Sequence, residues 1–274
     1  MKNIRQQRIL DWLSDHGHAA LAELTQVAAA RRLTIQRDLV ELEQAGRLKR
    51  IRGGAVSIDQ RWQTRPHEVR LQENRAAKES IATLAAAPLR DFQCVGLDGS
   101  STCTFLAPAL ARPTEKTNGH APRTVVATSI DTFMALRNVT GVQAVLSGGV
   151  LHRESGGMAG SLVGALAIQT IRSFHFDAVC ISGMGFDPAL GVYDSNAEDV
   201  SIKQALMSVA QRVFLLVDHT KWRAPQGVKV CETDALHAVI TDRHPGAAAK
   251  QLPKAVALIC SSAAGRVKRK DGTV

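Results

Sequence analysis

Small hydroxyl and glycine residues follow several short apolar segments of this sequence, and loops of this composition can bind an anion. The first is Asp98-Gly99-Ser100-Ser101-Thr102, which follows an apolar segment and opens a predicted helix. Thr128-Ser129, Gly148-Gly149 and Gly183 follow other apolar segments. Backbone N–H groups at a helix start and hydroxyl donors together bind phosphate well. We therefore expect these loops to line one phosphate-accepting crevice.

Charged residues in the same region would complete a site for a phosphorylated, sugar-like effector. Asp218 and Lys221 follow the apolar segment 213–217, and a lysine at a strand end supplies a point charge for phosphate. Glu198, Asp199 and Lys203 open another predicted helix. The two carboxylates either accept hydrogen bonds from sugar hydroxyls or only match the positive end of the helix dipole, and the sequence leaves both interpretations open.

Basic and amide side chains near the N-terminus have the types and spacing of a DNA-reading surface. Ile35, Leu39 and Leu42 lie on one face of a predicted helix. The polar residues around that face are Arg31, Arg32, Thr34, Gln36 and Arg37. A basic segment with glycines follows and contains Lys49, Arg50, Arg52 and Gly53. Arginine bonds guanine, glutamine bonds adenine and clustered positive charge attracts phosphates, so we expect double-stranded DNA as a partner.

Two different scaffolds must position these residues. Residues 1–58 contain three helical segments, and the third stops at Gly46. Residues 48–58 then alternate in hydrophobicity and are interrupted by Gly53-Gly54, which is typical of a β-hairpin. Helices followed by a hairpin predict a small N-terminal winged helix-turn-helix domain. The charged residues 59–74 form a predicted linker.

Residues 75–260 have the pattern of an α/β domain. Short apolar segments predict strands at 94–97, 124–127, 142–146, 178–181, 213–217, 238–240 and 255–259. Helical patterns lie between them at 75–87, 102–110, 131–137, 161–171 and 198–210. Apolar strands that alternate with helices predict a parallel sheet with helices on both faces. Residues 261–274 form a basic tail that we expect to be solvated.

Composition limits the class of protein. The 274 residues are 45% hydrophobic and 22% charged, and the net charge of +9 indicates a polyanionic partner without distinguishing DNA from a membrane. No apolar segment approaches the roughly 18 residues of a membrane span. No signal peptide is recognisable, so we expect a cytoplasmic protein. The cysteines are scattered and the histidines lack metal-ligand spacing, so neither a metal nor a cofactor is predicted.

Residues 5–56 resemble the N-terminal domain of the DeoR family of bacterial sugar-operon repressors. That family has TIRRDL and then R-x-HGGA, where this sequence has Thr34-Ile35-Gln36-Arg37-Asp38-Leu39 and Arg50-Ile51-Arg52-Gly53-Gly54-Ala55. Gln36 and Arg52 depart from the family pattern. Ala20 and Arg31 depart as well, because serine is usual at these expected helix N-caps. The resemblance implies operator binding, and we expect the departures to change the operator sequence.

Residues 75–242 resemble the effector domain of the same family, which is similar in fold to ribose-5-phosphate isomerase and glucosamine-6-phosphate deaminase. The family patterns D-x-G-T-T, T-N-S, GG, G-x-x-G and D-x-S-K fall on loops 98–102, 127–129, 148–149, 183–185 and 218–221. The resemblance implies that these loops hold the phosphate of an effector. Ser100 replaces a family glycine, so we expect a narrower pocket or a different backbone angle there.

Together these features predict a DNA-binding transcriptional regulator. The resemblance implies a repressor of a carbohydrate operon that a phosphorylated sugar-like metabolite releases from DNA. Reading of paired half-sites requires a homodimer or homotetramer. The alternative is an enzyme of the isomerase or deaminase type, because Asp98, Glu198, Asp199 and His219 offer groups for proton transfer. No catalytic residue is predicted, since an enzyme does not need a basic winged helix.

Overall fold

The chain divides into an N-terminal unit, made mainly of residues 1–64, and a second unit with most residues from Arg65 onwards, and each has a hydrophobic core of its own. The computed structural model describes residues 2–16, 18–51, 53–57, 67–111, 122–153, 160–223, 227–261 and 267–268. Each unit is described by itself.

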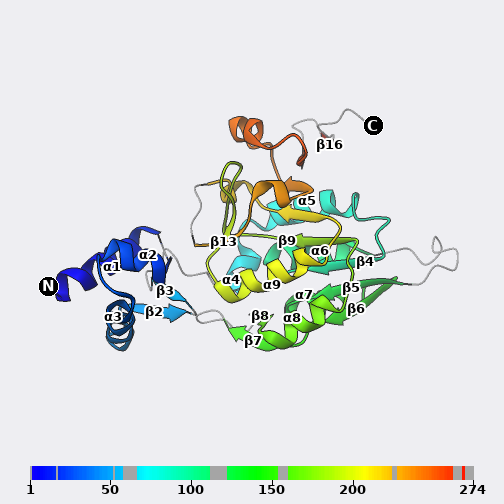
Figure 1. Cartoon of the computed structure of the whole chain (residues 1–274). Coiled ribbons are helices and arrows are strands. Elements are labelled where there is room, and N and C mark those ends of the chain that lie inside the picture. The colour runs from blue at the N-terminus through cyan, green and yellow to red at the C-terminus, as the bar shows by residue number, and fades with distance from the viewer. Residues whose placement is uncertain are drawn as a thin grey trace. The chain divides into compact units, whose positions relative to one another are not determined.

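The N-terminal unit combines helices with a three-stranded sheet (Figure 1). Its elements are α1 (Lys2–His16), β1 (His18–Ala20), α2 (Leu21–Val27), α3 (Arg32–Gln44), β2 (Leu48–Ile51) and β3 (Gly54–Ser57). The strands are antiparallel in the order β1-β3-β2. The predicted helices and hairpin are confirmed and form a winged helix-turn-helix. Strand β1 was not predicted, because a three-residue strand is too short to show alternation.

Apolar side chains at helical spacing bring these helices together. Ile9 and Leu13 of α1, Leu24 of α2, and Ile35 and Leu39 of α3 are at most 3% exposed and belong to one core. The core therefore fixes one face of α3 inward and leaves the opposite face outward.

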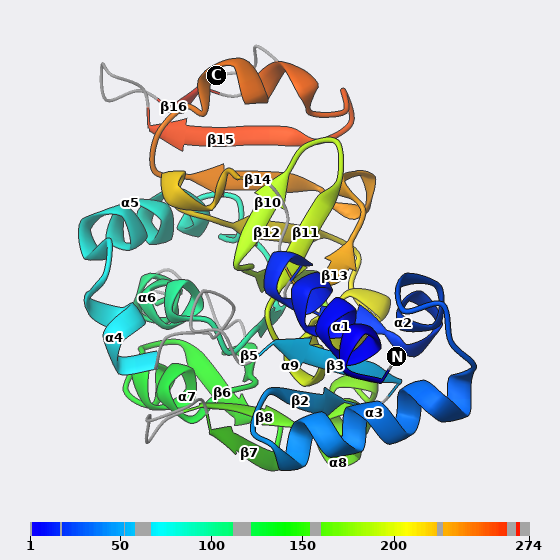
Figure 2. The same cartoon turned by 90° about the vertical axis from the view of Figure 1, so that its left-hand side faces the viewer.

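The second unit is built on an eight-stranded sheet in the order β16-β15-β14-β12-β9-β4-β5-β6. Its strands are β4 (Cys94–Leu97), β5 (Arg123–Ala127), β6 (Val142–Leu146), β9 (Ala178–Ile181), β12 (Val213–Leu216), β14 (Ala238–Thr241), β15 (Ala257–Ser261) and β16 (Val267–Lys268). All pairings are parallel except that of β16, which is antiparallel to β15. Figure 2 shows β14 and β15 toward one end of the sheet and β5 and β6 at the other. The predicted parallel sheet is confirmed.

Helices cover both faces of this sheet. They are α4 (His67–Gln72), α5 (Arg75–Ala86), α6 (Ser101–Ala109), α7 (Ile130–Leu136), α8 (Ala165–Arg172) and α9 (Ala197–Ser208). Ile81 of α5, Leu106 of α6 and Leu136 of α7 share a core with Val95 and other strand residues. Leu206 of α9 instead approaches Gly96, and neighbouring strand residues face opposite sides of a sheet. No helix within the described ranges is long and apolar enough to cross a membrane.

The structure corrects one predicted helix. Residues 161–163 belong to β8 (Gly160–Val163), which pairs antiparallel with β7 (Val150–Arg153). Helix α8 begins only after Gly164, whose φ of 89° ends the strand in a conformation that suits glycine. A second small sheet consists of β10 (Gly185–Asp187), β11 (Gly191–Asp194) and β13 (Val228–Cys231). These short strands lack an apolar run, so the sequence did not reveal them.

The predicted linker and tail also contain regular structure. Helix α4 lies within residues 59–74, which were predicted to be a linker, and it packs on α6. His67 at its start is 0% exposed. Strand β16 lies within the predicted tail and extends the sheet. The many charged residues and Pro66 are typical of a linker, and a helix this short depends on tertiary contacts that the sequence pattern does not reveal.

We predict that Gly54→Ala destabilises the N-terminal unit more than Gly53→Ala does. A Cβ at Gly54 would lie 2.1 Å from the carbonyl oxygen of Ala19, so β1 and β3 would have to separate. Gly53 has φ of 89° but open space around it, so alanine there costs only the strained backbone angle. We expect losses of about 3 kcal/mol and about 1 kcal/mol respectively. Hydrogen exchange over residues 2–57 of the full chain measures the opening of this unit, and equal protection in the two variants would contradict the packing argument.

Candidate functional site

Helix α3 presents its predicted DNA-reading residues to solvent. Arg31, Arg32, Gln36 and Arg37 are exposed, and Thr34 is partly buried. The N-terminal turns of a recognition helix are the part that reaches base edges in the major groove. The structure therefore brings these residues together on one surface, as a reading helix requires.

Leu33 belongs to the same surface, although the sequence analysis did not single it out. Its side chain is 72% exposed, between the exposed Arg32 and the reading residues that follow. An apolar side chain in this position can contact the methyl group of thymine. Leu33 is an apolar residue outside the buried helix face of Ile35 and Leu39, and this was the sequence signal that could have identified it.

The hairpin carries part of the predicted positive charge. Lys49 is exposed on β2, and Gly53, with φ of 89°, lies in the turn before β3. Arg50 is exposed, but its guanidinium lies 3.7 Å from the carboxylate of Glu43. The backbone N–H of Arg50 also donates to Glu43 at 2.8 Å, so the hairpin is tied to helix α3. Arg52 lies outside the described residues.

Helices α2 and α3 begin at N-cap residues whose side chains do not cap the helix, as the sequence predicted. Ala20 and Arg31 are N-cap residues with extended backbone, and neither side chain accepts a capping hydrogen bond. At α2, the carboxylate of Glu23 compensates by accepting from the Ala20 N–H at 2.8 Å. Helix α3 is held by buried Asp38, whose two carboxylate oxygens accept from the guanidinium of Arg5 in α1.

Asp98 is the polar centre of the carboxyl edge of the larger sheet. Its buried carboxylate accepts from the Ser100 N–H at 3.0 Å and from the Ser182 N–H at 2.8 Å. Lys203 of α9 donates to the same carboxylate and lies 3.5 Å from Asp194. These contacts join the ends of β4 and β9, where the strand order reverses. Ligands of open α/β sheets bind at such a reversal.

Burial and charge oppose each other in this ion pair. Burial would raise the pKa of Asp98, but the charge and hydrogen bond of Lys203 lower that pKa below its usual value. Burial would lower the pKa of Lys203, and Asp98 and Asp194 instead raise it above its usual value. Both groups are therefore ionised at neutral pH. Lys203 was predicted to bind the effector, whereas the structure shows its charge neutralised by carboxylates of the protein.

The start of α6 keeps backbone donors available for an anion. Ser100 is the N-cap, and its hydroxyl accepts from the Cys103 N–H at 3.2 Å. Its φ of −80° is ordinary, so the serine at this family glycine position needs no unusual backbone angle. Within the described part of the chain, the N–H groups of Ser101 and Thr102 have no hydrogen-bond acceptor. Both residues are only 4% exposed, so an anion there would be largely enclosed.

Thr128 and Ser129, which were predicted to bind the effector, make hydrogen bonds within the protein. Both residues are 0% exposed. The Thr128 hydroxyl donates to the carbonyl of Leu97 at 3.3 Å, which links β5 to β4. The Ser129 hydroxyl accepts from the Thr132 N–H at 3.2 Å and caps α7. An effector could reach these hydroxyls only if the two strand ends opened.

The predicted glycines permit close packing of the loops at this edge. Gly148 and Gly149 have φ of 70° and 114°. A Cβ at Gly99 would lie 2.2 Å from the hydroxyl of Ser161, and a Cβ at Gly183 would lie 2.8 Å from a backbone carbonyl. Close packing therefore explains the glycines at 99, 149 and 183, and the positive φ explains the glycine at 148, with or without a ligand.

Asp218 and Lys221 lie on a short 3-10 turn after β12. The Asp218 carboxylate caps the turn by accepting from the Thr220 N–H at 2.8 Å. Lys221 is partly buried, and its ammonium group forms no ion pair with another described residue. Burial lowers the pKa of Lys221, while Asp218 raises it and Arg223 lowers it further. Lys221 is therefore a cation that an incoming phosphate would stabilise.

The structure adds two polar contacts that the sequence did not predict. The exposed Glu198 of α9 lies 2.9 Å from Nδ1 of His152 on β7. Asp242 after β14 accepts from the backbone N–H of His219 at 2.7 Å and lies 2.8 Å from its ring Nδ1. The partners are far apart in the sequence, so residue spacing contained no signal for either contact.

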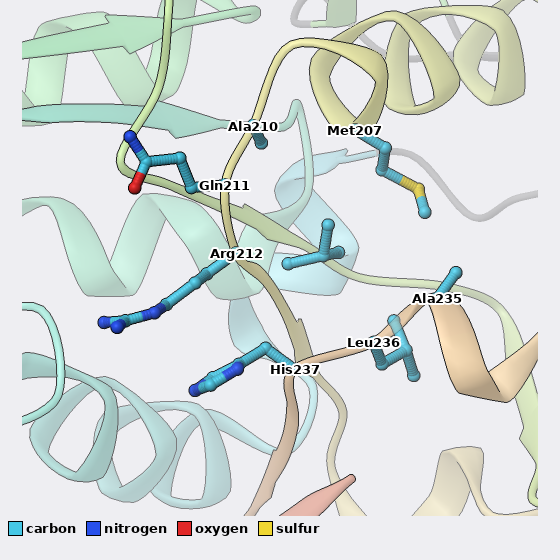
Figure 3. Close-up of a pocket in the computed structure, with 8 residues that line it drawn as sticks. Met207, Ala210, Gln211, Arg212, Ala235, Leu236 and His237 are labelled. Carbon is cyan, nitrogen blue, oxygen red and sulfur yellow. The ribbon is translucent and has the colours of Figure 1, made fainter. Parts of the chain in front are cut away.

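A pocket of about 330 Å³ lies at the opposite, amino edge of the sheet (Figure 3). It is lined by residues before and at the starts of β12 and β14, among them Arg212 and His237. Arg212 lies over the ring of Phe92, 5.1 Å from its centroid. None of the predicted effector residues lines this pocket. Across the described ranges, no group of at least three His, Cys, Asp or Glu residues could hold a metal ion.

Known proteins share both units of this chain. The profile of a DeoR-like helix-turn-helix domain matches residues 5–61, and that of the DeoR C terminal sensor domain matches residues 73–243. An L-fucose operon activator of Haemophilus influenzae is 30% identical over 246 residues, which cover 88% of this chain and 92% of that protein. The HTH-type transcriptional repressor GlcR of Bacillus subtilis is 29% identical over 240 residues, 88% of each chain. A ribose 5-phosphate isomerase from Methanocaldococcus jannaschii is 14% identical, with a TM-score of 0.37 over 55% of this chain and 56% of that chain.

We predict that Lys203→Met lowers the free energy of unfolding of the second unit by about 3–5 kcal/mol, because Asp98 would stay buried without a cation. The lowered pKa of Asp98 means that the pair's contribution is lost only as the pH falls below the usual aspartate range. The raised pKa of Lys203 means that the pair's contribution to stability is also lost when the pH rises above the usual lysine range. Urea unfolding should therefore show the same loss at about pH 5 and about pH 9.

The double variant Asp98→Asn with Lys203→Met is the matched control. It removes both charges, so it should be more stable than Lys203→Met alone. If the two variants unfold at the same urea concentration, the buried charge is not the cause of the loss.

Proposed function

The chain belongs to the DeoR family of helix-turn-helix transcriptional regulators, and we propose that it leaves its operator when a phosphorylated, sugar-like metabolite binds the second unit. The observation that carries this proposal is the exposed polar face of α3, including Arg32, Gln36 and Arg37, in a chain that also has a separate sensor unit. The first unit reads DNA, and the second changes the affinity for it.

The proposed reading surface consists of the exposed α3 residues and the hairpin. Arg37 and Gln36 contact base edges, Arg31, Arg32 and Thr34 contact bases or phosphates, and Leu33 packs on a thymine methyl group. Lys49, Arg50, Arg52 and Gly53 place the hairpin along the phosphate backbone. The exposure of these α3 side chains supports this assignment.

The proposed effector site is the carboxyl edge around Asp98. The phosphate accepts from the N–H groups of Ser101 and Thr102 and pairs with Lys221. The free amides at the start of α6 and the unpaired ammonium of Lys221 support this assignment. Asp98 and Lys203 hold the loops in place rather than contact the phosphate.

Release of DNA requires an assembly that can change its geometry. We propose a homodimer or homotetramer that places winged helices on half-sites about 34 Å, or a multiple of that, apart. The effector must bind the released arrangement more tightly than the DNA-bound one. The relatives include proteins named as activators and proteins named as repressors, and we propose repression of a carbohydrate operon in the cytoplasm for this chain.

An enzyme of the isomerase or deaminase type is not favoured. The relatives with high coverage are named as transcriptional regulators. Asp98, a candidate for proton transfer, is buried in an ion pair and so is not a free acid or base.

We predict that Arg37→Ala abolishes the electrophoretic shift of a duplex selected by this protein from a random library, at about 150 mM salt. The loss of one bidentate base contact is worth about 1–3 kcal/mol, and the loss of a charge adds to it. Arg172→Ala is the control, because it removes the same charge from an exposed position on α8. An unchanged shift with Arg37→Ala would remove Arg37 from the reading surface.

We predict that at least one phosphorylated sugar raises the melting temperature of the protein and weakens its binding to that same duplex. A ligand at 100 times its dissociation constant stabilises the folded state by about 2.7 kcal/mol. Thermal shift with a panel of sugar phosphates, followed by DNA binding with each hit, measures both effects. Release of DNA by an unphosphorylated metabolite, with no response to any sugar phosphate, would refute the phosphate part of the proposal.

A further inference from the structure

Asp199 on the first turn of α9 has a buried carboxylate oxygen without a partner. Within the described residues, its Oδ1 has no contact with solvent and no hydrogen-bond donor. This carboxylate also interacts with the charges of Lys203 and His152 and with the hydroxyl of Ser161 of β8. A buried acceptor left unpaired costs free energy, so such an atom in a folded protein indicates a missing donor.

The neighbours of Asp199 place it beside the effector loop. Ser161 contacts Gly99 so closely that a Cβ on that glycine would lie 2.2 Å from the Ser161 hydroxyl. Gly99 stands between Asp98 and the helix start that offers the free amides of Ser101 and Thr102. The carboxylate of Asp199 therefore lies next to the proposed effector site, on the side of β8 and α9.

The local charge excludes phosphate from this end of the crevice. Asp98, Asp194 and Asp199 lie around the buried cation Lys203, which already pairs with Asp98 and contacts Asp194, and His152 adds only a weaker attraction to Asp199. Burial and the charge of Asp194 raise the pKa of Asp199, since the cluster resists another negative charge. A hydroxyl or ammonium donor would satisfy Asp199, whereas an anion would be repelled.

We propose that Asp199 and Ser161 form a second subsite of the crevice, which binds a hydrogen-bond donor, either a hydroxyl or an ammonium group, on the end of the effector remote from its phosphate. This inference rests on the proposed effector function. It identifies the ligand class as a phosphorylated polyol or amino sugar, because inorganic phosphate bound at the α6 amides has no further group that extends to Asp199.

The test compares Asp199→Asn with the wild-type full chain in calorimetric titrations. The probes are inorganic phosphate, glucose 6-phosphate, ribose 5-phosphate, glucosamine 6-phosphate and the three corresponding unphosphorylated sugars. We expect Asp199→Asn to weaken the tightest sugar phosphate at least about tenfold and to change inorganic phosphate by no more than about twofold. Ser161→Ala should have a smaller effect in the same direction, and it keeps the test valid if Asp199→Asn folds poorly. Glu232→Gln, which removes an exposed carboxylate paired with Lys229, is the matched control.

The outcomes separate this inference from the proposed function. Equal losses for sugar phosphate and inorganic phosphate, or no loss for either, would overturn the subsite while leaving a phosphate-binding sensor intact. If only unphosphorylated sugars bind, and Asp199→Asn weakens them, the subsite stands and the phosphate proposal fails. If no probe binds the wild-type chain, both are overturned. A stronger effect of Asp199→Asn on glucosamine 6-phosphate than on glucose 6-phosphate would identify the donor as ammonium.

Discussion

A carboxylate without access to water must be neutralised within the protein, and the carboxyl edge of the large sheet is organised by this requirement at Asp98. Its partner Lys203 comes from α9, and its other donors are backbone N–H groups that follow β4 and β9. Loss of Lys203 would leave Asp98 buried without a cation, and loss of Asp98 would leave Lys203 with the more distant Asp194, 3.5 Å away. The pair therefore fixes α9 against the two strand ends, and with α9 it fixes the position of Asp199.

The polar residues of this edge fall into two groups, according to whether their hydrogen-bonding or charged groups already have partners within the protein. One group holds neighbouring strand ends together: Thr128 donates to the carbonyl of Leu97, and Ser182 donates through its hydroxyl to the carbonyl of Leu216. The other group keeps unused capacity, as in the amides of Ser101 and Thr102 and the ammonium of Lys221. Both groups consist of small or charged residues after strands, so residue type alone does not separate them. The N-terminal unit repeats this division, because Asp38 of the TIRRDL-like motif anchors α3 to Arg5 while the neighbouring Arg37 is exposed.

The parallel strands were predictable because most are short apolar runs, and the central ones are buried on both faces, such as Ala178–Ile181 and Val213–Leu216. The helices of the reading unit were predictable because Ile35, Leu39 and Leu42 repeat at helical spacing. Strands β7, β8, β10 and β11 were not predictable, because their pairing with each other, rather than an apolar pattern, makes them strands. Helix α4 was missed for a similar reason: it is short and depends on its contact with α6.

The sequence by itself determined the two scaffolds, the exposed face of α3 and the loops that gather at the carboxyl edge, because hydrophobic periodicity and chain order specify these features locally. Only the tertiary structure decided which polar residues in the loops are already bonded. Lys203, predicted among the effector residues, is paired with Asp98, and Asp199, predicted as a carboxylate at a helix start, has a buried oxygen with no partner among the described residues. The physical reason is that a hydrogen bond or ion pair depends on two groups meeting in space. The partner of Asp98 lies 105 residues away along the chain, where spacing has no bearing on contact.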